Sequence, residues 1–482
     1  MLSDFARKPS TSDSTRRTTR RKFVSHLASA VAVVAGGASI ANAADAPTQF
    51  QIQPNSLMRV RIEVDLKGNV NVPSNPLISR EKEKSVPLTS SALFDYEERY
   101  HDRDDSKSVA IERFYHKASS TRDIAKASTV INMRDSVRQV HIRRDQLPET
   151  TYAVDDYFTQ EELGLIKIPV CSAAVDQLLP TKAVSVGEKY KVGEAEIASL
   201  LNLAAVNKTD VEIEVVEIKS TRAKFQMTGN VHGSVNGVPT MMRVVGKMTF
   251  DREIGTCTWL AIALHETRDI GKAEPGFDVA ATIKMVRQPL PKVVALPARP
   301  FRFTATVPSN RMYVDLQSKS IDVAMLMDRR WKIMRDITGS VMMRMIDNDN
   351  SIAQCNIRPL ASLEAGKQWT LEAFQQDIKT ALGSQLSEFL QADQRLSASG
   401  LRVMRVVAQG SAEGVPIQWI MLHFSDDSGR RVQATFTMES YSVTKFAGAD
   451  VQLANSLRFT TPAPESTTEP ESRVSAKPAV RN

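Results

Sequence analysis

A proline-rich segment at residues 288–300 constrains the fold of this chain more than any other feature. It holds four prolines in 13 residues, and proline lacks the backbone N–H that helices and sheets need. The sequence therefore predicts a linker at 289–300 that separates two domains, 44–288 and 301–459. From residue 460 to 482 Pro, Glu, Ser and Thr dominate, a composition that buries too little apolar surface to fold and so predicts a disordered tail.

Residues 1–43 have the order of an export signal, because a basic stretch runs directly into a weakly apolar one. Thr19-Arg20-Arg21-Lys22-Phe23 resembles the twin-arginine consensus, in which Arg20, Arg21 and Phe23 occupy the matching places. Small residues before Ala43 predict cleavage between Ala43 and Ala44. The expected partners are the twin-arginine export machinery and signal peptidase, and the expected location is periplasmic or secreted.

A general secretory leader or a membrane anchor is the alternative interpretation of residues 1–43. The glycines and serine in the apolar run make it a poor permanent span, which needs about 20 strongly apolar residues. No other segment approaches that length. The sequence therefore predicts no permanent membrane span in the mature chain.

The charge of the mature chain argues against a nucleic-acid partner. The full chain has 62 basic and 55 acidic residues, a net charge of +7. Residues 1–43 hold seven of the basic and two of the acidic side chains, which leaves 55 and 53, or +2. A nucleic-acid-binding protein would show a basic surface with interleaved aromatics, whereas aromatics are only 6% here.

The first domain is expected to be a β-rich antiparallel domain. Met58, Val60 and Ile62 alternate with charged residues, the period of a half-buried strand. Residues 211–266 predict four strands in a meander, with a hairpin turn at 236–237. A helix is expected to begin at Thr159, for which Glu162 completes a capping box, and another is expected near 194–206. Segments 96–100 and 111–115 have the pattern of charged, partly exposed strands.

The second domain is expected to combine strands with one long helix. A strand is predicted at 301–307 and a hairpin from 417–425 and 431–438. A helix capped by Thr370 is predicted to extend to Leu390, because apolar residues recur at steps of three and four. Its expected apolar face consists of Leu371, Phe374, Ile378, Leu382, Leu386, Phe389 and Leu390.

The order of elements in 301–459 resembles the Mog1/PsbP-like domains, which include the exported DcrB-like proteins. Trp331 and the stretch Ser456-Leu457-Arg458-Phe459 stand where that pattern would place them. The resemblance covers about a third of the chain and implies an α/β sandwich that acts as a binding or accessory module, without family catalytic residues. The expected fold class is therefore α+β, a β-rich domain followed by an α/β sandwich.

Motifs for catalysis or metal binding are incomplete. His265-Glu266 begins like a zinc-protease HExxH but lacks the second histidine, and segments 102–105 and 347–350 lack the glycine and glutamate of calcium loops. No GxSxG is present. We therefore expect no catalytic residue, cofactor or metal. The cysteines Cys171, Cys257 and Cys355 have no CxxC spacing, and whether Cys171 pairs with Cys257 stays open.

Six methionines between 325 and 345 raise the alternative of a copper-handling protein, since thioethers bind Cu(I). They are Met325, Met327, Met334, Met342, Met343 and Met345. Methionine is also a flexible filler of cores and binding surfaces, and no histidine or cysteine stands nearby in ligand spacing.

These observations favour an exported, non-catalytic binding or accessory protein of the cell envelope, whose partner is an envelope protein or a small ligand. A hydrolase with dispersed residues is the first alternative, because residues that converge only in space leave no sequence motif. Trp419 and His423, on one face of a predicted strand, are the candidate partner surface.

Overall fold

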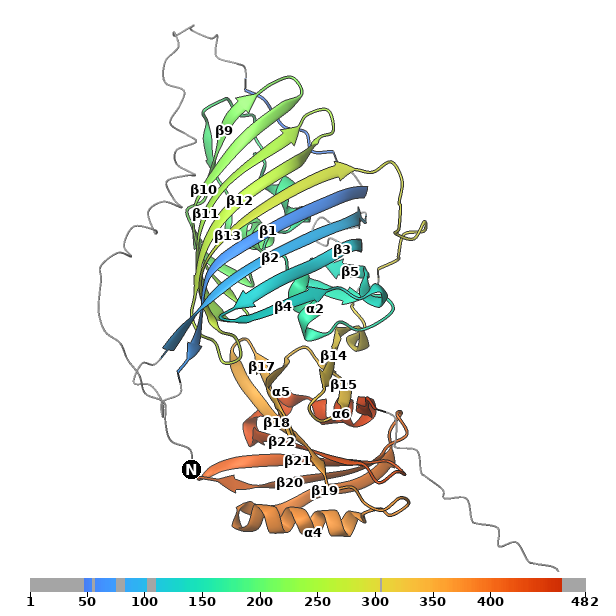
Figure 1. The fold of residues 1–482 in the computed structure, drawn as a ribbon. Helices are drawn as coiled ribbons and strands as arrows, with labels where there is room; N and C mark the ends of the chain where they lie inside the picture. Colours follow the sequence, from blue (N-terminus) through green and yellow to red (C-terminus); the bar gives the residue numbers. More distant parts are fainter. Residues whose placement is uncertain (1–46, 54–56, 75–82, 102–109, 304–305, 462–482) are drawn as a thin grey trace, which may run out of the picture. The chain divides into compact units, whose positions relative to one another are not determined.

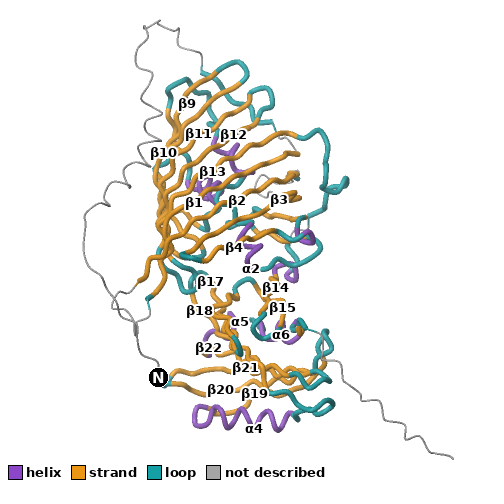
Figure 2. Tube along the Cα trace, in the orientation of Figure 1, coloured by secondary structure: helices purple, strands orange, loops and turns teal. Residues whose placement is uncertain are grey.

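The computed structural model describes residues 47–53, 57–74, 83–101, 110–303 and 306–461. Strands account for 56% of it and helices for 15%, and Figure 2 shows the same predominance of strands. The expectation of an α+β protein with an α/β sandwich is therefore wrong, because the chain is mostly β and is built on antiparallel sheets. The predicted export signal, with Arg20, Arg21, Phe23, Ala43 and Ala44, lies outside the described residues.

The largest sheet has 13 strands. Its order is β6-β5-β3-β2-β1-β13-β12-β11-β10-β9-β7, with β4 paired to β3 and β8 to β10, so that β1 and β13 are neighbours (Figure 1). The strands are β1 (Leu57–Pro73), β2 (Glu83–Tyr100), β3 (Ala110–Ile124), β4 (Ala127–Asn132), β5 (Gln139–Arg143), β6 (Thr150–Ala153), β7 (Lys189–Lys191), β8 (Ala205–Thr209), β9 (Glu212–Ile218), β10 (Arg222–Val235), β11 (Val238–Asp251), β12 (Thr256–Arg268) and β13 (Gly276–Pro289).

Local sequence patterns place several of these strands. Met58, Val60 and Ile62 alternate as predicted and are all 0% exposed in β1. The predicted turn joins β10 to β11, where Asn236 and Gly237 have φ of 52° and 84°, as a two-residue hairpin turn requires. Strands β9 to β12 form the predicted meander.

Helical segments of the same part contact this sheet: η2 (Asp135–Val137), α2 (Gln160–Leu165), η3 (Ser172–Leu178) and α3 (Glu194–Leu201). The predicted capping box of α2 is confirmed, since Thr159 Oγ1 accepts a 3.2 Å bond from Glu162 N and the Glu162 carboxylate accepts a 2.9 Å bond from Thr159 N. The Asp176 carboxylate fixes η3 by accepting bonds from Cys257 N at 2.7 Å and Arg287 at 2.9 Å.

Two smaller sheets follow, with orders β16-β17-β18-β22-β21-β20-β19 and β14-β15-β23. The strand predicted at 301–307 is not formed in its described residues. The strands are β14 (Tyr313–Ser318), β15 (Val323–Asp328), β16 (Trp331–Ile337), β17 (Ser340–Asp347), β18 (Asn350–Leu360), β19 (Leu386–Leu396), β20 (Arg402–Ala412), β21 (Val415–Ser425), β22 (Arg431–Glu439) and β23 (Arg458–Phe459). The helices are η4 (Ser309–Met312), α4 (Leu371–Leu382), η5 (Gly383–Gln385), η6 (Ser440–Ser442), α5 (Val443–Phe446) and α6 (Ala449–Ser456).

The predicted long helix is a helix over its first part only and continues as a strand. Thr370 caps α4 as expected, through a 3.2 Å bond from Ala373 N, but the helix ends at Leu382 and β19 begins at Leu386. Two bulges in β19 put its partly buried apolar residues at Leu386, Phe389 and Ala392. Their spacing of three imitates a helix. Figure 1 shows α4 lying along β19 and β20.

The stretch that carried the family resemblance stabilises the three-stranded sheet. Ser456 Oγ bonds to both the N and O atoms of Leu326, at 3.1 and 3.0 Å. Leu457 is 0% exposed, and Arg458 pairs with Asp315 at 3.2 Å. These residues therefore have a structural role.

Residues 290–303 form neither helix nor strand and are called the strap below. Among the described residues, each sheet takes its strands from one side of the strap only. No helix in the described part is long and apolar enough to cross a membrane. Cys171, Cys257 and Cys355 are free and buried.

Candidate functional site

A group of charged and hydroxyl side chains is buried where β2, β3 and η3 meet. The Glu98 carboxylate accepts hydrogen bonds from Arg113 Nε at 3.0 Å and from the Ser172 hydroxyl at 2.8 Å. Tyr96 and Arg113 donate to Ser172 Oγ at 2.9 and 3.1 Å. Glu98, Tyr96 and Ser172 are all 0% exposed. This inner cluster fastens η3 to the sheet and presents no surface to a substrate.

The strap is bound on the opposite face of the same strands, to which Glu97 points because side chains alternate along a strand. The Glu97 carboxylate accepts bonds from Val294 N at 2.9 Å and Ala295 N at 3.0 Å. The Arg99 guanidinium donates to Pro297 O. The predicted linker is therefore held against β2 by charge-assisted hydrogen bonds, which are among the stronger ones in proteins.

The end of the strap covers two histidines and a glutamate. His101 Nε2 lies 2.9 Å from one Glu112 oxygen, and His141 Nε2 lies 3.8 Å from the other. The ring of Phe301 is 4.1 Å from that of His141, and the ring of Phe303 is 4.8 Å from that of His101. The histidines are scattered in sequence, but β3, β5 and the strap bring these groups together.

Burial and hydrogen bonding set the ionisation of Glu97, Glu112 and His141, which form an outer cluster. Burial opposes ionisation of Glu97, but the strap backbone and His116 hold its pKa below the ordinary 4.5. Burial also opposes ionisation of Glu112, whose pKa is nevertheless lowered by its bond to His101. Burial lowers the pKa of His141 from 6.5 to about 4. At neutral pH the cluster therefore holds ionised carboxylates beside a neutral His141.

The candidate partner surface at Trp419 and His423 is corrected by the structure. Trp419 is 5% exposed and His423 is 0% exposed, because α4 covers β20 and β21. The His423 ring is stacked at 5.4 Å on Trp369, whose ring also lies near Phe374 and the Arg431 guanidinium. Neither candidate is available to a partner in this conformation.

The methionines lie mostly in the core. Met325, Met327, Met343 and Met345 are at most 1% exposed and belong to the main apolar cluster. Their burial is typical of core packing.

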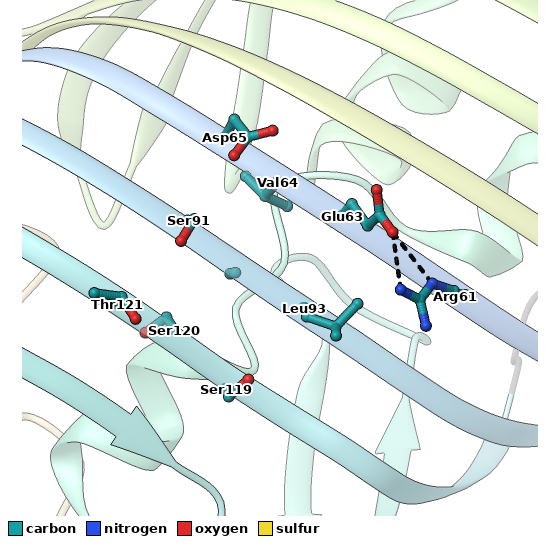
Figure 3. A pocket seen from close by; sticks show the side chains of 10 residues that line it. Arg61, Glu63, Val64, Asp65, Ser91, Leu93, Ser119, Ser120 and Thr121 are labelled. Atoms are coloured by element: carbon teal, nitrogen blue, oxygen red, sulfur yellow. Dashed lines mark hydrogen bonds and ion pairs between the residues drawn. The ribbon is translucent and has the colours of Figure 1, made fainter.

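An open polar hollow of about 240 Å³ lies over β1, β2 and β3 (Figure 3). Ser91, Ser119 and Thr121 leave space there because their side chains are small. Its ion pair, Arg61–Glu63 at 3.0 Å, is about half exposed on both sides, at 52% and 48%. Exposed charges orient a ligand weakly, so the hollow is a poor candidate site.

Three basic residues that the motif search missed come together elsewhere. Lys167 follows α2, Arg329 lies between β15 and β16, and Lys332 is in β16. Each lies within electrostatic range of another of the three. Two sequence signals could have suggested them: a lysine inside the apolar run 165–168, and the basic run 329–332.

No protein-family model matches the chain, and no curated protein matches it. Several solved structures are similar over part of it. A crystal structure from Bacteroides thetaiotaomicron VPI-5482 is 13% identical, with a TM-score of 0.22, over 30% of this chain and 47% of that chain. The chain thus spans about half the length of that protein.

The solution structure of cyanobacterial PsbP (CyanoP) from Synechocystis sp. PCC 6803 is 11% identical, with a TM-score of 0.25, over 33% of this chain and 99% of that chain. A protein of unknown function from Pseudomonas aeruginosa is 11% identical, with a TM-score of 0.21, over 32% of this chain and 99% of that chain. A PsbP is thus among the structural neighbours, at scores too low to assign a fold or a function.

Proposed function

We propose that this chain is an exported, non-catalytic binding or accessory protein of the cell envelope. The observation that carries the proposal is the use of the buried acids. Glu97 binds the strap backbone, Glu98 binds Ser172 of η3, and Glu112 pairs with His101 and Arg99. These groups hold the fold together.

The exposure of the acidic side chains to a substrate distinguishes a binding protein from an enzyme here. A general base must reach the proton it abstracts from a substrate, whereas Glu97, Glu98 and Glu112 are all 0% exposed. Ser172, whose hydroxyl donates to the buried Glu98 carboxylate, is also 0% exposed. The arrangement supports a structural role for these ion pairs, not a catalytic one.

The sequence supports the proposed location and the accessory role. The leader resembles a twin-arginine signal, which supports export to the envelope. Residues 301–459 resemble the Mog1/PsbP-like family in element order, and that resemblance implies an accessory role.

The proposal is tested by recovering the tagged chain from cells and separating envelope from cytoplasm. A native mass spectrum of the envelope fraction is expected to show a bound compound that is released unchanged on denaturation. Recovery from the cytoplasm alone would contradict the location. Conversion of the bound compound by the purified chain would show an enzyme instead.

A further inference from the structure

Two segments distant in sequence meet around Lys167, Arg329 and Lys332. Gln160 Nε2, in α2, donates a 2.5 Å bond to Trp331 O, the residue that precedes Lys332 in β16. Arg329 Nη1 donates a 2.6 Å bond to the main-chain oxygen of Thr151 in β6. The first bond holds the backbone of β16 against α2, and the second, with a 3.3 Å bond from Arg329 Nη2 to Arg311 O, holds the Arg329 guanidinium in place. The three basic residues are called the cation cluster below.

The members of the cation cluster have no acid partner among the described residues. No described carboxylate lies within ion-pair distance of Lys167, Arg329 or Lys332, although ion pairs are common elsewhere in the chain. The acid that acts on both lysines is Glu274. It is already engaged, accepting a 2.6 Å bond from Asn236 and lying 3.7 Å from Arg268.

The remaining charges around the cluster leave it positive. Asp328 acts on Arg329 and Lys332, but its carboxylate pairs with Arg330 at 3.1 Å. Arg268 adds a further positive charge near Lys167.

The cations of the cluster repel one another. Burial and then Lys332 lower the pKa of Lys167. Burial also lowers the pKa of Lys332, with Arg329 acting in the same direction and Glu274 against it. The pKa of Arg329 falls to about 10, mainly through burial. A bound anion would relieve this repulsion.

The cluster also contains a hydrogen-bond donor without a partner. The Nε atom of Arg329 is buried and has no hydrogen-bond partner in the described part of the chain, and such a buried donor is costly to leave unpaired. Nearby protein atoms partly desolvate Lys167 and lower its pKa, but its side chain still has surface exposed to water. Lys332 is half-buried, so a ligand from solution can reach the two ammonium groups. The guanidinium of Arg329, whose terminal nitrogens donate to Thr151 O and Arg311 O, adds its positive charge beneath them.

We propose that Lys167, Arg329 and Lys332 form a binding site for a multiply charged oxyanion of the phosphate type. The inference rests on the proposed binding function and names its ligand class. A phosphate group carries close to two negative charges and several strong acceptors, which suit two ammonium groups and a guanidinium. The group can come from a free phosphate compound or from a lipid headgroup.

The test uses the full chain, purified without phosphate, in titrations with inorganic phosphate against chloride at matched ionic strength. Lys167→Gln and Lys332→Gln are each expected to weaken the phosphate Kd by about tenfold or more, as loss of a charged hydrogen bond does. Lys247→Gln, a change at an exposed lysine of β11, is the matched control and should leave the Kd unchanged.

A second readout separates binding from a structural role. Without phosphate, the melting temperatures of the Lys167→Gln and Lys332→Gln variants should equal or exceed that of the wild type, because one repelling charge is gone. With phosphate, only the wild type and the Lys247→Gln control should gain stability. A lower melting temperature of both lysine variants in chloride would overturn the proposal in favour of a structural role.

Vesicles distinguish the source of the phosphate group. Cosedimentation with phosphatidylglycerol but not phosphatidylcholine vesicles, lost in Lys167→Gln, would support the site with a headgroup as ligand. Failure of the folded chain to bind phosphate or these vesicles would overturn the site, as would equal binding by Lys167→Gln. If the chain from cells then carries a compound of other chemistry, the proposed binding function stands without this site.

Discussion

The N–H group of Ala295 donates a 3.0 Å hydrogen bond to the carboxylate of Glu97, a residue 198 positions earlier in the chain. The bond joins the strap to a long strand of the largest sheet. It also explains how a charged residue is buried in β2, since the strap backbone supplies the donors that water would otherwise supply.

Removal of the Glu97 charge should loosen the strap. Glu97→Gln is expected to lower the free energy of unfolding by about 2–4 kcal/mol, because buried partners lose a charged acceptor. Urea denaturation measures the loss, and limited proteolysis should cut first within the strap. Glu63→Gln, in an exposed ion pair, should change stability by no more than about 0.5 kcal/mol. Equal effects of the two changes would contradict the role given to Glu97.

Acidification should destabilise the chain before its carboxylates titrate. The pKa values of His141 and His423 are about 4 in the fold against 6.5 ordinarily. The unfolded chain therefore binds protons first as pH falls through 6.5, and stability declines down to about pH 4, by at most about 3 kcal/mol for each histidine. Melting temperatures measured across this range should fall with pH.

A variant that lacks one of these histidines checks the assignment. His423→Gln should show a shallower decline than the wild type between about pH 6.5 and pH 4. Glu97 and Glu112 act in a separate window, because their lowered pKa values make their stabilisation disappear only below the ordinary 4.5. A pH dependence that is unchanged by His423→Gln would show that His423 does not contribute.

Two tryptophans should differ sharply in their effect on stability. Trp419 is 5% exposed under α4, whereas Trp259 on β12 is 38% exposed. Trp419→Ala is expected to cost about 3–5 kcal/mol, and Trp259→Ala should cost clearly less, about 1–2 kcal/mol, because its side chain is only partly removed from water. Thermal or urea unfolding measures both. A folded Trp419→Ala variant of nearly normal stability would indicate that Trp419 lies at the surface of the wild-type protein and not in its core.

Patterns that depend on near neighbours were readable from the sequence. The alternation of Met58, Val60 and Ile62, the capping box at Thr159 and the turn at Asn236 each need only residues a few positions apart. The helix prediction through Leu390 failed because the bulges of β19 give a strand the apolar spacing of a helix.

Features that depend on distant partners were not readable. Glu97 and Glu98 can be buried only because the strap and η3 supply their hydrogen-bond partners. Those partners are distant in sequence, so the charges alone suggested partly exposed strands. The meeting of Lys167 and Lys332 likewise depends on a long-range contact, in which Gln160 of α2 bonds to Trp331 of β16. Such sites form only when the sheets are assembled.

Export should depend on the paired arginines, because they occupy the recognised places of the twin-arginine pattern. Replacement of Arg20 and Arg21 by lysine should leave the precursor in the cytoplasm, which fractionation and immunoblotting detect. Sequencing of the exported chain should give Ala44 as the first residue. Undiminished export of the double variant would rule out the twin-arginine route.

The central claim, that the cation cluster binds an oxyanion, is tested most directly by anomalous diffraction. Crystals of the full chain grown without phosphate are soaked in tungstate, a tetrahedral oxyanion with a strong anomalous signal. The account predicts a difference peak within hydrogen-bond distance of the Lys167 and Lys332 ammonium groups, absent from Lys167→Gln crystals. Well-occupied peaks elsewhere with none at the cluster would contradict it.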